Sequence, residues 1–195
     1  MAETPLFGLV LCGGQSKRMG RDKASLSYHG KPQIRHAWEL LRDAGLEAYV
    51  SCRADQAEGF KGLPQIADRF LGFGPMGGLL SALLFRRDAA FLAVACDLPF
   101  LDADALSRLI AARDPSKIAT AYLGHEGLPE PLCAIYEPSA YSALLGFVGQ
   151  GIHCPRKALI RSDIRALAPE NAEALANVNH PGEYEAAREA LRKIL

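Results

Sequence analysis

The chain is organised around FGLVLCGGQSKRMGRDK, which occupies residues 7–23. Its first five residues form a short apolar run, which predicts a buried strand. The run ends at Gly13-Gly14, where the backbone can approach a ligand closely and leave N–H groups free. Ser16, Arg18 and Lys23 follow among further cations, and such groups pair well with phosphate oxygens. The stretch therefore predicts a strand that leads into a triphosphate-binding loop.

The two best-known phosphate loops do not describe this stretch. A Walker A pattern, G-x-x-x-x-G-K, fails when it is counted from Gly13 or from Gly14. The dinucleotide pattern, G-x-G-x-x-G, cannot be laid on Gly13, Gly14 and Gly20. A glycine turn followed by a solvated basic surface is the structural alternative. The density of cations favours the phosphate site, because a plain turn needs no such cluster.

Residues 11–24, LCGGQSKRMGRDKA, resemble the signature loop of molybdenum cofactor guanylyltransferases, and more broadly of nucleotidyltransferases that share L-x-G-G-x-S-x-R-M-G-x-D-K. We call residues 11–24 the signature loop. The resemblance implies that the loop binds the nucleotide through Leu11, Cys12, Gly13, Gly14, Ser16, Arg18 and Lys23. It also implies a catalytic role for Arg18 and Lys23, on the triphosphate and the leaving group.

Length and composition narrow the class of protein. A chain of 195 residues predicts a single domain, 1–195, with a sizeable core. Acidic and basic residues balance at 22 each, so no global field favours nucleic acid or a membrane surface. No apolar run approaches ~20 residues, and the N-terminus lacks a secretory apolar region. Five scattered cysteines without a C-x-x-C predict free thiols in a reducing cytoplasm.

Strand and helix patterns alternate along the chain. Strands are expected at residues 7–11, 47–51, 91–96, 117–123, 131–136 and 164–167, and helices at 32–44, 77–86, 102–113, 139–147, 155–161 and 181–195. This alternation predicts an α/β protein, a three-layer α/β/α fold with a mostly parallel sheet and helices on both faces. Ligands of such sheets bind beyond the carboxyl ends of the strands. The family resemblance implies the same architecture, a Rossmann-like nucleotidyltransferase fold.

A second feature is ACDLPFL, residues 95–101. Asp97 directly follows the apolar run of residues 91–96, so it should lie at the carboxyl end of a central strand. A carboxylate there can hold Mg²⁺, which prefers oxygen ligands. The alternative is a turn or N-cap role before Pro99, but Asp102 is the better cap for the next helix. The family carries a metal-binding Asp in this C-D-x-P context, which implies Mg²⁺ as cofactor and a catalytic role for Asp97.

The loop DRFLGFGPMGG, residues 68–78, resembles a family segment that helps to bind the guanine nucleotide. The resemblance implies that Asp68 contacts the base. A carboxylate can accept hydrogen bonds from the N1–H and 2-amino edge of guanine, which adenine does not offer in that arrangement. Taken without the resemblance, the loop is better described as a flexible glycine loop with Asp68 as a solvated turn residue.

One later segment completes the resemblance, and a second is notable for its charge. Asn177-Val-Asn179 resembles the family's N-x-N near the metal and the pterin, which implies substrate-binding roles for Asn177 and Asn179; a polar turn before the last helix is the alternative. The basic segment HCPRK, residues 153–157, either reaches an anionic substrate or begins a surface helix.

One departure from the family pattern stands out. Many relatives have an Asn-Arg pair after the second strand, whereas this chain has Cys52-Arg53 after Ser51, and a thiol is only a weak donor. The base preference therefore stays open.

The resemblance implies that the phosphate of molybdopterin attacks the α-phosphorus of GTP and that pyrophosphate leaves. GTP and molybdopterin, with or without molybdenum, are then the substrates, and other cofactor-biosynthesis proteins or recipient molybdoenzymes are expected partners. Two alternatives remain. One is the same chemistry on CTP with molybdopterin, or on an NTP with a sugar phosphate. The other is a protein that binds nucleotide or pterin without turnover, against which Arg18, Lys23 and Asp97 argue.

Overall fold

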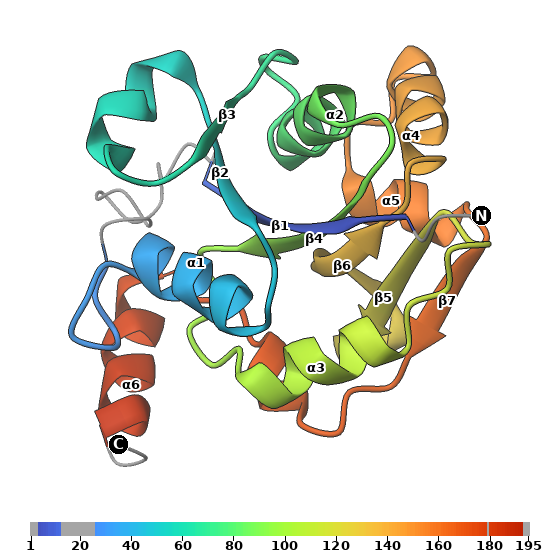
Figure 1. The fold of residues 1–195 in the computed structure, drawn as a ribbon. Helices are drawn as coiled ribbons and strands as arrows, with labels where there is room; N and C mark the ends of the chain where they lie inside the picture. The colour runs from blue at the N-terminus through green and yellow to red at the C-terminus, as the bar shows by residue number, and fades with distance from the viewer. Residues whose placement is uncertain (1–3, 13–25, 179, 193–195) are drawn as a thin grey trace.

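A mixed seven-stranded sheet forms the centre of the protein (Figure 1). The computed structural model describes residues 4–12, 26–178 and 180–192. The strands are β1 (Leu6–Leu11), β2 (Ala48–Cys52), β3 (Gln65–Ala67), β4 (Ala90–Ala95), β5 (Ala119–Leu123), β6 (Pro129–Tyr136) and β7 (Ile164–Leu167). Their order is β3-β2-β1-β4-β6-β5-β7. All neighbours pair in parallel except β6, which is antiparallel to both β4 and β5, so the mostly parallel sheet is confirmed.

Helices cover both faces of the sheet, which confirms the three-layer α/β/α prediction (Figure 1). One face carries α1 (Gln33–Asp43) and α3 (Ala103–Ala111), and the other carries α2 (Pro75–Phe85), α4 (Ala140–Gly149) and α5 (Pro155–Ile160). The last helix, α6 (Pro181–Arg192), packs on Leu26 and Tyr28 in a small cluster of its own. Short 3₁₀ segments are η2 (Ala54–Phe60), η3 (His125–Gly127) and η4 (Ala172–Leu175).

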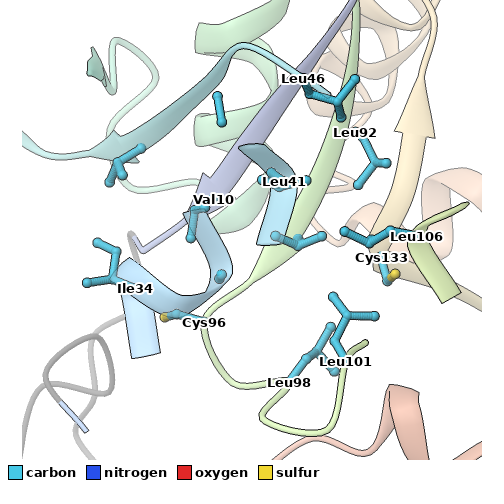
Figure 2. Packing of buried hydrophobic residues seen from close by; sticks show 14 of the residues in the cluster. Val10, Ile34, Leu41, Leu46, Leu92, Cys96, Leu98, Leu101, Leu106 and Cys133 are labelled. Carbon is cyan, nitrogen blue, oxygen red and sulfur yellow. The ribbon is translucent and has the colours of Figure 1, made fainter. Parts of the chain in front are cut away.

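The two faces of the sheet bury separate cores. Every residue of β4 is buried, as the continuous apolar run predicts for a strand covered on both sides. On the face of α1 and α3, Val10 and Leu92 meet Leu41 and Leu106 (Figure 2). Such close packing makes β1 and β4 a rigid platform for the loops that follow them.

The expected helix ends are present. Asp102 caps α3, because its Oδ1 accepts a hydrogen bond from the Ala105 N–H at 2.8 Å. Gly45 follows α1 with a φ of 83°, the left-handed conformation that glycine adopts most readily. Four elements were not expected, namely β3 and the 3₁₀ segments η2, η3 and η4. Of these, η2 and β3 lie in the connection between β2 and α2, for which the sequence predicts no regular structure.

All five cysteines lie in the described residues and are free thiols, and four of them are buried. This confirms the free thiols that their scattered positions predict. Within the described ranges, no helix is long and apolar enough to cross a membrane.

Candidate active site

The carboxyl ends of four adjacent parallel strands meet at one edge of the sheet. Asp68 follows β3, Cys52 ends β2, Leu11 ends β1, and Asp97 lies two residues beyond β4. Neighbouring strands lie ~4.8 Å apart, which separates β3 from β4 by about 14 Å. The edge therefore offers an elongated site with one predicted carboxylate at each end, where ligands of such sheets bind.

Cys12 and Leu26, the described residues on either side of residues 13–25, are both connected to this edge. Cys12 is buried, and its backbone N–H donates to the Ser51 carbonyl at 3.2 Å. The chain returns at Leu26, whose carbonyl accepts from the Gln33 N–H at 2.7 Å. The Gln33 side chain in turn donates to the Leu98 carbonyl at 3.3 Å. Cys12 thus lies beside β2, and Leu26 is connected through Gln33 to the segment that carries Asp97. The remaining predicted residues of the signature loop lie outside the described ranges, namely Gly13, Gly14, Ser16, Arg18 and Lys23.

Asp97 is held at its end of the edge by its neighbours. Cys96 and Leu98, on either side, are buried in the core under α1 (Figure 2). The Asp97 carbonyl accepts a hydrogen bond from the Val178 N–H at 2.9 Å. This bond brings Asn177 next to Asp97, although 80 positions separate them in the sequence. Asn179 lies outside the described residues.

The donor set at this end suits a small, hard cation. A carboxylate at Asp97 and an amide oxygen at Asn177 are both hard oxygen ligands, the type that Mg²⁺ prefers. Among the described residues, no group of three or more His, Cys, Asp or Glu side chains is arranged to hold a metal. Mg²⁺ often takes only one or two protein carboxylates and completes its shell with substrate phosphates and water.

Asp68 is fixed at the other end of the edge. Its backbone N–H donates to the Cys52 carbonyl at 2.9 Å, and its Oδ1 accepts from the Ser51 hydroxyl at 2.5 Å. The next N–H, of Arg69, donates to the Ser81 hydroxyl of α2 at 2.8 Å. Burial raises the pKa of the Asp68 carboxyl, and the Ser51 hydrogen bond and Arg53 offset part of that rise. Asp68 is thus a half-buried, oriented acceptor rather than a solvated turn residue.

Two glycines let α2 approach this end closely. A Cβ at Gly77 would lie 2.1 Å from the Phe70 carbonyl oxygen, and a Cβ at Gly78 would lie 2.5 Å from the Ser51 hydroxyl. The first turn of α2 therefore packs directly on the Asp68 loop and on the end of β2. The Gly-Gly sequence is required here by close approach, since neither glycine has a positive φ.

We expect Gly77→Ala to destabilise the protein by about 1–3 kcal/mol, because the Phe70 backbone must move to admit the methyl group. The measurement is the free energy of unfolding in urea. Gly146→Ala is the matched control in α4, where a Cβ would meet no described atom within 4 Å, and a gain of about 0.5–1 kcal/mol is expected. Equal stability of the two variants would contradict the close packing.

Beyond β4, the same edge of the sheet continues along β6, β5 and β7, and we call this part the second half of the edge. It contains a cavity of about 630 Å³. The cavity lies between the end of β5, the start of β6 and the segment that follows β7, and Asn177 lines it. Arg156 of α5 lines it too, and pairs with the nearly buried Glu130 at 2.8 Å between Nη2 and Oε2. Of the two interpretations of residues 153–157, the helix start is confirmed, because Arg156 lies in the first turn of α5. The contact with an anionic substrate stays a prediction.

The sequence analysis missed Ser51 and Glu130. Glu130 is a lone carboxylate within an otherwise apolar strand, a pattern that indicates a buried partner. Ser51 gave no comparable indication, because its contact with Asp68 depends on the pairing of β2 with β3.

Comparison with known proteins places the chain among nucleotide-transferring domains. Residues 8–185 match the model of the MobA-like NTP transferase domain. A Rhizobium johnstonii protein named molybdenum cofactor guanylyltransferase is 35% identical over 204 residues, covering 96% of this chain and 95% of that protein. A Synechocystis protein named molybdenum cofactor biosynthesis bifunctional protein is 37% identical over 187 residues; the match covers 94% of this chain but 54% of that longer relative.

The fold has a close counterpart among solved structures. The crystal structure of molybdopterin-guanine dinucleotide biosynthesis protein A from Archaeoglobus fulgidus superposes with a TM-score of 0.79 at 25% identity. The superposition covers 95% of this chain and 98% of that one. The Rossmann-like nucleotidyltransferase fold expected from the signature loop is thereby confirmed.

Proposed function

The chain belongs to the family of MobA-like NTP transferase domains, and on that basis we propose that it is a molybdenum cofactor guanylyltransferase. It joins GMP from GTP to the phosphate of molybdopterin, with release of pyrophosphate. The observation that supports the proposal is the single sheet edge along which Asp68, Cys12 at the start of the signature loop, Asp97 and Asn177 follow one another. The whole chain, residues 1–195, acts as one nucleotidyltransferase domain in the cytoplasm.

The nucleotide lies along β3, β2, β1 and β4 in this proposal. Asp68 receives the guanine edge, and the signature loop receives the triphosphate through the Gly13 and Gly14 backbone, Ser16, Arg18 and Lys23. Leu11 and Cys12 contribute backbone contacts, since both side chains are buried. Phosphoryl chemistry of this kind depends on positioning and charge neutralisation rather than on covalent help from the protein. Arg18 and Lys23 stabilise the charge that develops on the leaving pyrophosphate.

Asp97 and the Asn177 amide oxygen would hold Mg²⁺ at the phosphate end. When bound, the ion neutralises phosphate charge and polarises the α-phosphate. The Val178–Asp97 backbone bond keeps the two oxygen donors together, and the buried Cys96 and Leu98 keep Asp97 in place.

The acceptor lies over the second half of the edge. The cavity beside Asn177 offers room for the pterin, with Asn177 and Asn179 binding it between the metal and the cavity. Arg156, partly exposed and anchored by Glu130, supplies a cation for the acceptor's phosphate. The product then passes to recipient molybdoenzymes or to other proteins of cofactor biosynthesis.

The test is pyrophosphate release from each of the four NTPs, with and without molybdopterin, in Mg²⁺. We expect release only with GTP and molybdopterin together. Preferential use of CTP would instead indicate a cytidylyltransferase, in keeping with the Cys52 departure. Release with a sugar phosphate would indicate a different acceptor. Stoichiometric binding without release would indicate a carrier and contradict the enzyme assignment.

A further inference from the structure

We propose that Ser51 is the positioning residue for base selection: its buried hydroxyl orients the Asp68 carboxylate toward the guanine edge. The inference rests on the proposed function, since it deepens the role of Asp68 in that site. Ser51 lies on β2, directly beside β3, and is fully buried. Its Oγ donates to Asp68 Oδ1 at 2.5 Å, the length of a short charge-assisted hydrogen bond.

Helix α2 packs closely against the Ser51 hydroxyl. On the side of α2, a Cβ at Gly78 would lie 2.5 Å from the Ser51 Oγ, so the helix backbone closes that side. The Ser51 carbonyl is already used by the Cys12 N–H, at the start of the signature loop. A hydroxyl has one proton to donate, and here Asp68 receives it. Ser51 therefore links the base end of the site to the strand end from which the phosphate loop departs.

Neither neighbour of Ser51 performs the same task. The Cys52 thiol lies on the opposite face of the sheet, in the α1 core, where it contacts Gln65 Oε1 at 3.5 Å. The Arg53 guanidinium makes two hydrogen bonds of 2.9 Å to Asp55. The direct side-chain donor to Asp68 within the described residues is therefore the Ser51 hydroxyl.

Among the described residues, few charges act on Asp68 besides the adjacent Arg69. Arg53 follows β2 and favours the ionised carboxylate, while Asp55 and Glu58 of η2, which packs on β3, are exposed acids. Helix α2, packed on β3 from the other side, carries no charged residue. Burial raises the pKa of the Asp68 carboxyl, and the Ser51 hydrogen bond is the largest influence that lowers it. Loss of the hydroxyl should therefore raise the Asp68 pKa further.

The test compares Ser51→Ala with wild type by calorimetric affinity for GTP and ATP. We expect about a tenfold loss of GTP affinity, the usual effect of losing one hydrogen bond to a charged group, and unchanged ATP affinity. GTP binding needs the carboxylate, so it is lost as pH falls through the Asp68 pKa. Because that pKa is higher in Ser51→Ala, the loss should begin at a higher pH than in wild type.

A double-mutant cycle separates positioning from a merely structural role. In an Asp68→Ala background, Ser51→Ala should change GTP affinity no further, because its effect passes through Asp68. Ser162→Ala is the matched control: it removes a serine hydrogen bond of 2.8 Å to the Ala158 carbonyl, after α5, and should leave the GTP-to-ATP ratio unchanged.

The outcomes distinguish this inference from the proposed function. Wild-type protein that binds GTP and CTP equally would overturn the proposed function and this inference together. A second outcome would overturn the inference alone. In it, wild-type protein prefers GTP, and Ser51→Ala keeps the full preference and loses GTP binding over the same acidic pH range as wild type. Equal losses for GTP and ATP, or additive effects in the cycle, would also overturn it.

Discussion

Asp97→Asn should lower Mg²⁺-dependent pyrophosphate release by about a hundredfold or more, the usual scale for losing one preorganised electrostatic contact. The substitution keeps the shape of the side chain and one oxygen, but it removes the charge that anchors the ion. GTP should still bind without metal, because Asp68 and the signature loop are unchanged. The thermal midpoint should also stay close to wild type, since Cys96, Leu98 and the Val178 backbone bond hold the segment without the carboxylate.

Asp102→Asn is the matched control for this prediction. It makes the same chemical change five positions later, at the N-cap of α3, where asparagine caps about as well as aspartate. Both variants should therefore fold alike, and only Asp97→Asn should lose turnover. A stable Asp97→Asn protein with wild-type, Mg²⁺-dependent turnover would refute the metal role. A lower melting temperature without a specific loss of turnover would assign Asp97 a structural role instead.

Much of the architecture could be predicted from the sequence because its elements are long and locally encoded. The continuous apolar run before Asp97 is typical of a strand buried on both faces, and β4 is such a strand. The Asp102 cap and Gly45 define helix ends through interactions within a few residues. The position of Asp97 at the sheet edge follows from the same local pattern.

Other features depend on contacts between distant segments and could not be predicted. The direction of β6 is one, because an apolar run does not encode whether its neighbours are parallel; β6 pairs in the antiparallel sense with β4 and β5. With three residues, β3 is too short for any periodic pattern. The Ser51–Asp68 bond and the Asn177 segment beside Asp97 are set by strand register and by one long-range backbone bond.

The buried pair of Arg113 and Glu137 carries the second large prediction, this time on stability. The guanidinium makes two hydrogen bonds to the carboxylate, at 2.7 Å and 2.8 Å, and the side chains are only 10% and 2% exposed. A third guanidinium nitrogen donates to the Thr4 carbonyl at 3.0 Å. One arginine thus joins the end of α3, the end of β6 and the entry to β1, at the edge of the sheet opposite the candidate site.

We expect Arg113→Ala to lower the free energy of unfolding by about 3–5 kcal/mol, because the Glu137 carboxylate stays buried without its counter-charge. This is a large share of the stability of an ordinary domain. Urea denaturation at pH 7 measures it, and Lys61→Ala, which breaks the exposed pair with Glu58, should cause no measurable change.

Replacing both partners distinguishes the cost of an uncompensated charge from the loss of a favourable attraction. An Arg113→Met, Glu137→Leu double variant should recover most of the stability lost in Arg113→Ala, since well-packed apolar side chains can replace a buried ion pair at little cost. GTP affinity of the folded protein should be unchanged in both variants, because the pair lies at the far edge of the sheet. If Arg113→Ala unfolds at the same urea concentration as Lys61→Ala, or if the double variant is less stable than Arg113→Ala, the buried charge is not what makes this arginine necessary.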